Sequence, residues 1–398
     1  MATLLFGPSE VILASGLTWI SLRSEGEVPV TVPDPLPVEG KPVQPQPESD
    51  VPPKILCGAF SPGGSLLALC DDHKQMTVWR CSDRALLRQW NVQRRANSVA
   101  FHGEDAILVA DKTGDAHLFS VEKEDGGGGR VILGHLSMLL DVAVSACGKF
   151  VITCDRDEKI RVSNFPDAHS IHSYCLGHTE FVSSVCAVPG SPDLLLSSSG
   201  DGTVKCWEFK SGTELSSRLC YEDAGLAMFD GGEEKGDAKG DDDFRRKARQ
   251  TPAVKRIKVR AFDGGPVVVV ASIEGFNGVL SYSFDADTKS LELKQKIEVA
   301  SPLWDMGFDS SGDLWALESD VPFFTVFSLK EGSFVPAIGG KPKETPHITK
   351  KLEDGKKLST GLDDLYKRWF DNMKDYLDKK EKRLAQQQNG SSGKKVKV

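Results

Sequence analysis

The sequence predicts an all-β protein, a seven-bladed β-propeller with disordered loops, followed by a C-terminal amphipathic α-helix. Three observations favour this fold: a repeat of 43–44 residues, many short apolar runs separated by Gly- and Pro-containing turns, and a helical apolar pattern after Thr360. The chain has 398 residues, of which 39% are hydrophobic and 27% charged. This ordinary composition excludes collagen-like and wholly disordered classes of protein.

The repeat is clearest in two consecutive units. Gly134-His135 is followed 22 residues after the His by Asp157, and Gly177-His178 is followed 23 residues after the His by Asp201. Each unit holds two short apolar runs before the Asp and a third run after it. This order and spacing resemble the WD repeat, the four-stranded blade of a β-propeller.

The polar residues of each repeat fit a hydrogen-bonded relay within one blade. A His in the entry loop, a hydroxyl on the second strand, an Asp in the next turn and a Trp on the third strand can satisfy one another when buried. This reading makes the histidines structural and not catalytic. The second unit supplies all four residues, namely His178, Ser197, Asp201 and Trp207. The first unit supplies three, namely His135, Thr153 and Asp157, and has Ser163 at the Trp position.

The remaining blades have weaker signals on the same spacing. We expect the N-terminal strands to form one blade, and a closure between them and the segment near Phe323–Leu329 so that no sheet edge stays open. The expected blades, in chain order, are Leu4–Leu22, Ile55–Trp79, Asn97–Val121, the two units described above, Val254–Phe284 and Leu303–Phe327.

Two stretches within the predicted propeller, residues 1–340, do not read as blades. Val28–Pro53 holds nine of the 21 prolines, and residues 222–250 begin with an acidic run of nine Asp/Glu against two Lys. We expect both to be disordered insertions. The basic run Arg245–Arg260 that follows is expected in a long surface loop.

The C-terminal region, residues 341–398, is a basic tail on an acidic body. It has 16 Lys/Arg and 9 Asp/Glu, so its charge of +7 leaves −15 on residues 1–340 of a chain whose total is −8. Thr360-x-x-Asp363 resembles a capping box and predicts a helix over 360–388. Its apolar face can pack back on the propeller or hold a partner, while its cationic end can meet RNA phosphates through Lys379, Lys380, Lys382 and Arg383.

No motif for catalysis or metal binding is found. The sequence lacks a nucleophile elbow, a phosphate-binding loop and a zinc-type helix, and its nine cysteines include no C-x-x-C pair. No apolar run reaches the length of a membrane span. We therefore predict a non-enzymatic protein with no catalytic residues, no metal and no membrane association, and reduced thiols inside the cell.

One turn carries an unusual density of charge. Six of the seven residues from Asp155 to Arg161 are charged and of mixed sign. A solvated turn with locally paired charges is one interpretation. The other is a partner-docking site, because charge complementarity on a rigid scaffold fixes the register of a complex. The candidate docking residues are Asp155, Arg156, Asp157, Glu158, Lys159 and Arg161.

Long strings in this region resemble the WD-repeat non-catalytic subunit of eukaryotic tRNA (guanine-N7)-methyltransferase. The resemblance is dense over 109–203, including the runs Leu133–Ser145, Asp155–Ser163 and Leu176–Ser183, and it returns in the tail at Leu365–Leu384. It is thin elsewhere. The Pro-rich and acidic insertions have no counterpart in the resemblance.

The resemblance implies a scaffold that binds and stabilises an S-adenosylmethionine-dependent catalytic subunit in a heterodimer. Together the two would methylate a guanosine in the variable loop of tRNA, with the cofactor held by the catalytic partner and none by this chain. The charged turn would dock the partner, with the position of Arg161 functionally sensitive, and the tail would lie near the tRNA.

Two further expectations concern location and the competing function. The cluster Lys394-Lys395-Val396-Lys397 can be read as a nuclear import signal or as a solvated tail, and we expect a location in the nucleus. The alternative function is a general interaction scaffold, such as a ubiquitin-ligase substrate receptor. Such receptors often carry Trp-Asp-x-Arg at the end of a blade, but Trp304-Asp305 and Trp207 are not followed by that Arg.

Overall fold

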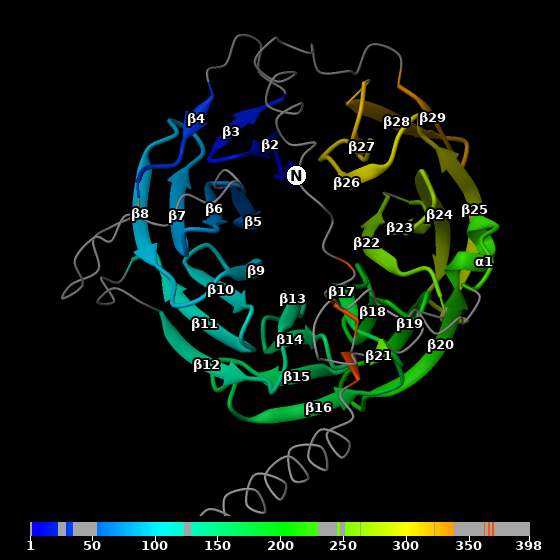
Figure 1. Cartoon of the computed structure of the whole chain (residues 1–398), viewed down its shortest axis with the longest axis horizontal. Helices are drawn as coiled ribbons and strands as arrows, with labels where there is room; N and C mark the ends of the chain where they lie inside the picture. Colours follow the sequence, from blue (N-terminus) through cyan, green and yellow to red (C-terminus); the bar gives the residue numbers. More distant parts are fainter. Residues whose placement is uncertain are drawn as a thin grey trace, which may run out of the picture. The chain divides into compact units, whose positions relative to one another are not determined.

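The computed structural model contains seven four-stranded antiparallel sheets arranged as the blades of a ring (Figure 1). It describes residues 2–22, 29–34, 54–122, 129–229, 245–246, 251–262, 264–321, 323–337, 362, 365–366 and 368–369. The predicted seven-bladed β-propeller is confirmed. Within these residues no helix is long and apolar enough to cross a membrane.

Each blade is built from four strands that are consecutive in the sequence. Blades 1 to 3 comprise β1 Thr3–Phe6, β2 Val11–Ser15, β3 Thr18–Ser21 and β4 Val30–Thr31; β5 Ile55–Phe60, β6 Leu66–Asp71, β7 Gln75–Arg80 and β8 Leu86–Asn91; β9 Ala96–His102, β10 Ala106–Asp111, β11 Asp115–Ser120 and β12 Arg130–Gly134. Blade 4 comprises β13 Leu139–Val144, β14 Phe150–Asp155, β15 Ile160–Asn164 and β16 Ile171–Cys175.

The second half of the ring repeats this order. Blades 5 to 7 comprise β17 Val182–Ala187, β18 Leu194–Ser199, β19 Thr203–Glu208 and β20 Thr213–Leu219; β22 Val254–Ala261, β23 Val267–Ile273, β24 Gly278–Asp285 and β25 Ser290–Glu298; β26 Leu303–Phe308, β27 Leu314–Glu318, β28 Phe324–Lys330 and β29 Ser333–Pro336. The first strand of each blade contacts the first strands of its two neighbours, so these seven strands surround the centre of the ring.

Apolar packing between neighbouring blades holds the ring together. The described core divides into seven clusters, and each lies between two adjacent blades. Between blades 4 and 5, for example, Ile152 and Val162 pack with Leu195 and Trp207, all of them buried. Burying apolar area contributes about 25 cal/mol per Å². A blade has such packing on both faces, so its middle strands read as continuous apolar runs.

The ring closes between blade 7 and blade 1 without sharing strands. Phe323 and Phe324 pack with Leu4 and other apolar residues of blade 1, as the expected closure requires. The carboxylate of Asp305 on β26 accepts hydrogen bonds from Thr3 Oγ1 at 2.6 Å and from the Leu4 amide at 2.9 Å. Trp304-Asp305 is therefore part of an inner strand, and its Asp fastens the two ends of the ring.

Two expected insertions contribute regular structure where they are described. Val30–Thr31 of the Pro-rich stretch form β4, because they can pair with β3 and complete blade 1. Residues 222–224 of the acidic stretch belong to the short helix α1, Cys220–Ala224, which ends at Gly225 in a left-handed conformation. The expectation of disorder was wrong at these positions. The other residues of 28–53 and 222–250 lie outside the described part, apart from the flanking residues and one short strand.

The basic run and the tail also differ from the expectation. Val254–Ala261 is the inner strand β22 and not a surface loop, because its alternate residues reach the apolar core of blades 5 and 6. A second compact unit comprises residues 230–250 and 367–398. Its described residues form two antiparallel strands, β21 Arg245–Arg246 and β30 Arg368–Trp369. These last two residues are therefore not helical, and nearly all of the predicted helix 360–388 lies outside the described residues.

Candidate partner-docking surface on blade 4

The relay of blade 5 brings together the four residues that the sequence singled out. His178 Nδ1 lies 2.8 Å from Asp201 Oδ2, and its Nε2 lies 2.7 Å from Ser197 Oγ. Trp207 Nε1 donates to the same hydroxyl at 2.8 Å. Burial alone would raise the pKa of Asp201, but the hydrogen bond and charge of His178 lower it to about 2. The network fixes the loops at one end of the blade.

Blade 4 forms the corresponding contacts with a different Asp. His135 Nε2 lies 2.8 Å from Thr153 Oγ1, and its Nδ1 lies 2.9 Å from Asp155 Oδ2. The assignment of Asp157 to this relay was wrong. Asp155 ends β14 facing the His, whereas blade 5 has Ser199 at the matching position and uses an Asp two residues later. Asp157 is thereby left in the turn at the surface.

Asp155 also organises the charged turn between β14 and β15. Its Oδ1 accepts the amide of Lys159 at 2.9 Å, and its own amide donates to the Lys159 carbonyl at 3.0 Å. Glu158 takes a left-handed conformation with φ of 72°. Such a conformation is uncommon for a residue other than Gly and shows how tightly the turn is held. The turn therefore holds its outward-facing side chains in fixed positions.

Four of the six predicted docking residues reach the surface. Arg156, Asp157 and Glu158 are half-buried, and Lys159 is exposed. Arg156 Nε lies 3.8 Å from Asp157 Oδ1, and Lys159 Nζ donates to the Asp157 carbonyl at 3.1 Å. Exposed pairs of this kind contribute little to stability, typically about 0–1 kcal/mol. Their charges remain available to a partner.

Arg161 does not present its charge to a partner, and neither does Asp155. Arg161 is 6% exposed. Its guanidinium donates to Ser163 Oγ at 2.9 Å and to the carbonyls of Gly134 at 3.0 Å and Ala168 at 2.9 Å. Burial lowers the pKa of this guanidinium. Blade 4 has Ser163 where blade 5 has Trp207, and Arg161 links this Ser to the backbone at Gly134 and Ala168.

An apolar residue beside the turn was missed by sequence reasoning. The loop Gly134–Met138 is joined to the turn by a hydrogen bond from the Arg156 amide to the Met138 carbonyl at 2.9 Å. Within this loop the side chain of Leu136 is fully exposed. The only sequence signal was a Leu directly after the relay His. We call Leu136, Arg156, Asp157, Glu158 and Lys159 the blade 4 surface.

One cluster in the described residues has the chemistry of metal ligands: Asp111, Asp115 and His117. Asp111 Oδ1 already accepts hydrogen bonds from Thr113 and from the amides of Gly114 and Asp115, and its Oδ2 faces His117 Nε2 at 3.3 Å. These contacts hold the turn between β10 and β11 of blade 3, with the His on the third strand and not in the entry loop as in blades 4 and 5.

Solved structures share the fold at low sequence identity. The "Crystal structure of RRP9 WD40 repeats" has a TM-score of 0.59 and 18% identity, covering 80% of this chain and 87% of that one. The "Structure of U3-55K" has a TM-score of 0.58 and 18% identity, covering 85% of this chain and 92% of that one. At this identity the likeness concerns the propeller alone.

Sequence comparisons are more specific. The family model described as "tRNA methyltransferase TRM82 WD40 domain" matches residues 128–317. The "tRNA (guanine-N(7)-)-methyltransferase non-catalytic subunit WDR4" of Mus musculus is 41% identical over 338 residues, covering 82% of this chain and 76% of the relative. The subunit named wuho of Drosophila melanogaster is 30% identical over 355 residues, covering 84% and 76%. The chain belongs to this family of non-catalytic subunits.

Membership in the non-catalytic subunit family agrees with the polar clusters described above. The blade 4 and blade 5 histidines are committed to their own blades, and each Asp–His pair stabilises a turn. The family model covers both of these blades and the blade 4 surface.

The start of the tail lies against blade 5. The ring of Tyr366 packs edge-on against Phe181, with 5.1 Å between the ring centroids, and the Leu365 amide donates to the Leu362 carbonyl at 2.9 Å. Phe181 is fully buried. The four predicted RNA-contacting residues lie outside the described part of the chain: Lys379, Lys380, Lys382 and Arg383.

Proposed function

We propose that this chain binds and stabilises the S-adenosylmethionine-dependent catalytic subunit of a tRNA (guanine-N7)-methyltransferase as a heterodimer. The complex methylates a guanosine in the variable loop of tRNA. The catalytic partner holds the cofactor and performs the transfer, and this chain supplies a rigid surface. Membership in the non-catalytic subunit family supports the proposal.

The observation that carries the proposal is the blade 4 surface. It combines one fully exposed apolar side chain with four charged side chains, two basic and two acidic, on a turn fixed by Asp155. Protein interfaces gain affinity from a few buried anchors and gain specificity from complementary charges around them. Leu136 is the anchor in this proposal, and Arg156, Asp157, Glu158 and Lys159 set the register. Arg161 is a positioning residue that acts through the loops it supports.

The tail contributes the contact with tRNA. Its net charge is +7, whereas residues 1–340 carry −15. Binding of RNA phosphates depends on a local excess of Lys and Arg of this kind. Changing Lys379, Lys380, Lys382 and Arg383 together to Glu should lower the affinity of the complex for tRNA. It should also flatten the dependence of that affinity on salt concentration. An unchanged salt slope would remove the tail from the RNA contact.

The proposed location of this chain is the nucleus. The cluster Lys394-Lys395-Val396-Lys397 supports import into the nucleus. A fluorescent fusion of the full chain should accumulate there, and replacing the three lysines by Gln should spread it through the cell. Nuclear accumulation that does not depend on these lysines would require another import route.

Reconstitution tests the function directly. The matching catalytic subunit is expressed alone and together with this chain, and methylation is measured by incorporation of labelled methyl groups into tRNA. Co-expression should yield a stable complex and raise the amount of 7-methylguanosine formed per catalytic subunit. A catalytic subunit that is equally stable and active without this chain would refute the proposal.

A further inference from the structure

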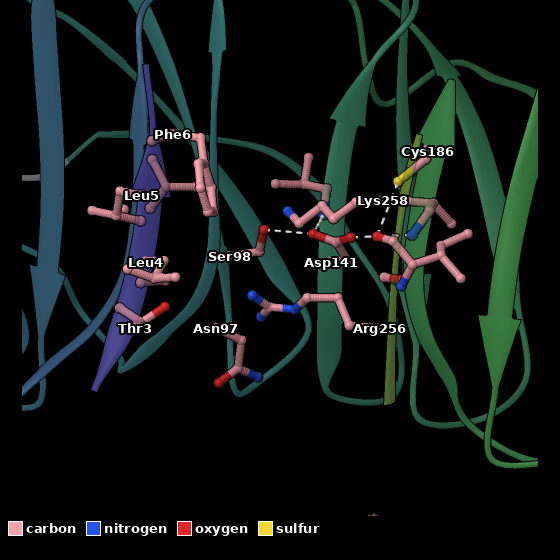
Figure 2. Close-up of a pocket in the computed structure, with 18 of the residues that line it drawn as sticks. Thr3, Leu4, Leu5, Phe6, Asn97, Ser98, Asp141, Cys186, Arg256 and Lys258 are labelled. Carbon is pink, nitrogen blue, oxygen red and sulfur yellow. Dashed lines mark hydrogen bonds between the residues drawn. The ribbon is translucent and has the colours of Figure 1, made fainter. Parts of the chain in front are cut away.

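The basic inner strand of blade 6 places cations in the centre of the ring. Arg256, Lys258 and Arg260 occupy alternate positions of β22, so their side chains share one face of the strand. All three line a central cavity of about 460 Å³ bounded by inner strands of the blades. Figure 2 shows Arg256 and Lys258 among its lining residues, with Asp141 from blade 4.

The two Asp residues in and beside the cavity already accept hydrogen bonds that join neighbouring blades. Asp141 accepts hydrogen bonds from Ser98 Oγ of blade 3 at 2.7 Å and from the Val185 amide of blade 5 at 3.1 Å. Asp305 accepts hydrogen bonds from blade 1 and from Arg256 Nη1, the latter at 3.1 Å. These carboxylates are structural acceptors, and three cations against two carboxylates leave an excess of positive charge.

Two of the three cations, Lys258 and Arg256, keep donors available. Among the described residues, none forms a hydrogen bond or ion pair with the ammonium of Lys258. The two terminal nitrogens of Arg260 donate to the carbonyls of Asp309 and Ser310, but its Nε is buried without an acceptor in the described part of the chain. Arg256 keeps 48% of its side chain exposed beside its ion pair with Asp305. An anion in the cavity would therefore accept from Lys258 and Arg256, and Arg260 would add the attraction of its charge.

We propose that the central channel binds a small molecule carrying several phosphate groups. The cavity volume falls in the range of small-molecule sites, about 300–1,000 Å³. Guanidinium groups hold phosphate oxygens through paired hydrogen bonds, and Lys adds a mobile point charge. Several phosphates match three clustered cations better than a single carboxylate does. This function is separate from docking the catalytic subunit, since the channel and the blade 4 surface share no residue.

Tripolyphosphate is a suitable probe. Titration calorimetry on the full chain should show saturable binding, and the ligand should raise the melting temperature. The variant Lys258→Gln should bind at least tenfold more weakly, whereas Lys258→Arg should retain binding. The matched control Lys294→Gln removes an exposed Lys from the outer strand of the same blade and should bind like the wild type. Equal melting temperatures without ligand establish that the variants are folded.

Three outcomes would overturn the proposal. The first is the absence of binding at millimolar tripolyphosphate. The second is unchanged binding by Lys258→Gln, which would assign the anion to the basic tail or another surface. The third is equally tight binding of citrate, a tricarboxylate of similar charge, which would remove the preference for phosphate. Loss of binding to the catalytic subunit is not expected in Lys258→Gln, so the two proposals fail independently.

Discussion

Replacing Arg161 by Leu should destabilise blade 4 before it affects any partner. The guanidinium is 6% exposed and donates to Ser163 and to two backbone carbonyls at 2.9–3.0 Å. Leu retains much of the apolar packing of the Arg stem but supplies no donor. The carbonyls of Gly134 and Ala168 then lose the donor that Arg161 provides.

The magnitude follows from these contacts. Each buried acceptor left unsatisfied costs about 1–3 kcal/mol, and hydrogen bonds from a charged donor contribute about 1.5–3 kcal/mol each. Burying the guanidinium charge costs free energy, as the lowered pKa of Arg161 shows. Leu does not carry this cost, and its removal offsets part of the loss. The expected net loss in the free energy of unfolding is about 3 kcal/mol, a large effect for one substitution. In a protein of this size it corresponds to a lowering of the melting temperature by roughly 5 °C.

Differential scanning calorimetry of the isolated chain measures this effect. Arg161→Lys keeps the charge but loses the planar fork, so its melting temperature should fall between those of the wild type and Arg161→Leu. Lys159→Leu, in the same turn but exposed, should change stability by no more than about 0.5 kcal/mol. An Arg161→Leu variant that melts like the wild type and yet fails to bind the catalytic subunit would refute the reasoning. Arg161 would then contact the partner directly.

Two further predictions concern the carboxylates. Because folding lowers the pKa of Asp201 from 3.8 to about 2, the unfolded state binds its proton more readily, and about 2 kcal/mol of stability should be lost as the pH falls through this range. Acid unfolding of Asp201→Asn, followed by circular dichroism, should lack this component; an unchanged acid transition would contradict the assignment. Asp305→Ala should lower the free energy of unfolding by about 3 kcal/mol or more, because the Leu4 amide and Arg256 lose their acceptor at the ring closure. Increased cleavage of the N-terminal strands by protease should accompany this loss, and an equally resistant ring would argue against the closure.

The sequence predicted the blades where their determinants are local. The His, Ser, Asp and Trp of blade 5 lie within one repeat, and the turns between its strands impose the spacing. The same local pattern was insufficient in blade 4. Asp155 and Asp157 lie in one turn two residues apart, and only the three-dimensional path of β14 decides which carboxylate faces His135.

Burial of charged residues was harder to predict. A middle strand of a blade is covered on both faces by neighbouring blades, so alternation no longer separates exposed from buried positions. Arg161 lies on such a strand and is buried, although its charge favoured a surface position. Arg256 and Lys258 lie on an inner strand instead and face the channel, which a basic run in the sequence could not indicate.

Short strands in unusual composition were also missed. Val30–Thr31 were assigned to a disordered insertion because prolines surround them. Two paired residues suffice to complete blade 1, since the first three strands already provide the template. The exposure of Leu136 had no sequence signature, because a Leu in a loop is buried or exposed according to what packs over it.

The affinity of this chain for the matching catalytic subunit tests the central claim most directly. The double variant Glu158→Lys and Lys159→Glu reverses two charges of the blade 4 surface. The control Glu292→Lys and Lys294→Glu reverses an exposed ion pair on the outer strand of blade 6. The account predicts that Kd measured by biolayer interferometry rises at least 100-fold, about 2.7 kcal/mol, for the blade 4 variant and stays unchanged for the control. Wild-type affinity in the blade 4 variant, with the same melting temperature, would contradict it.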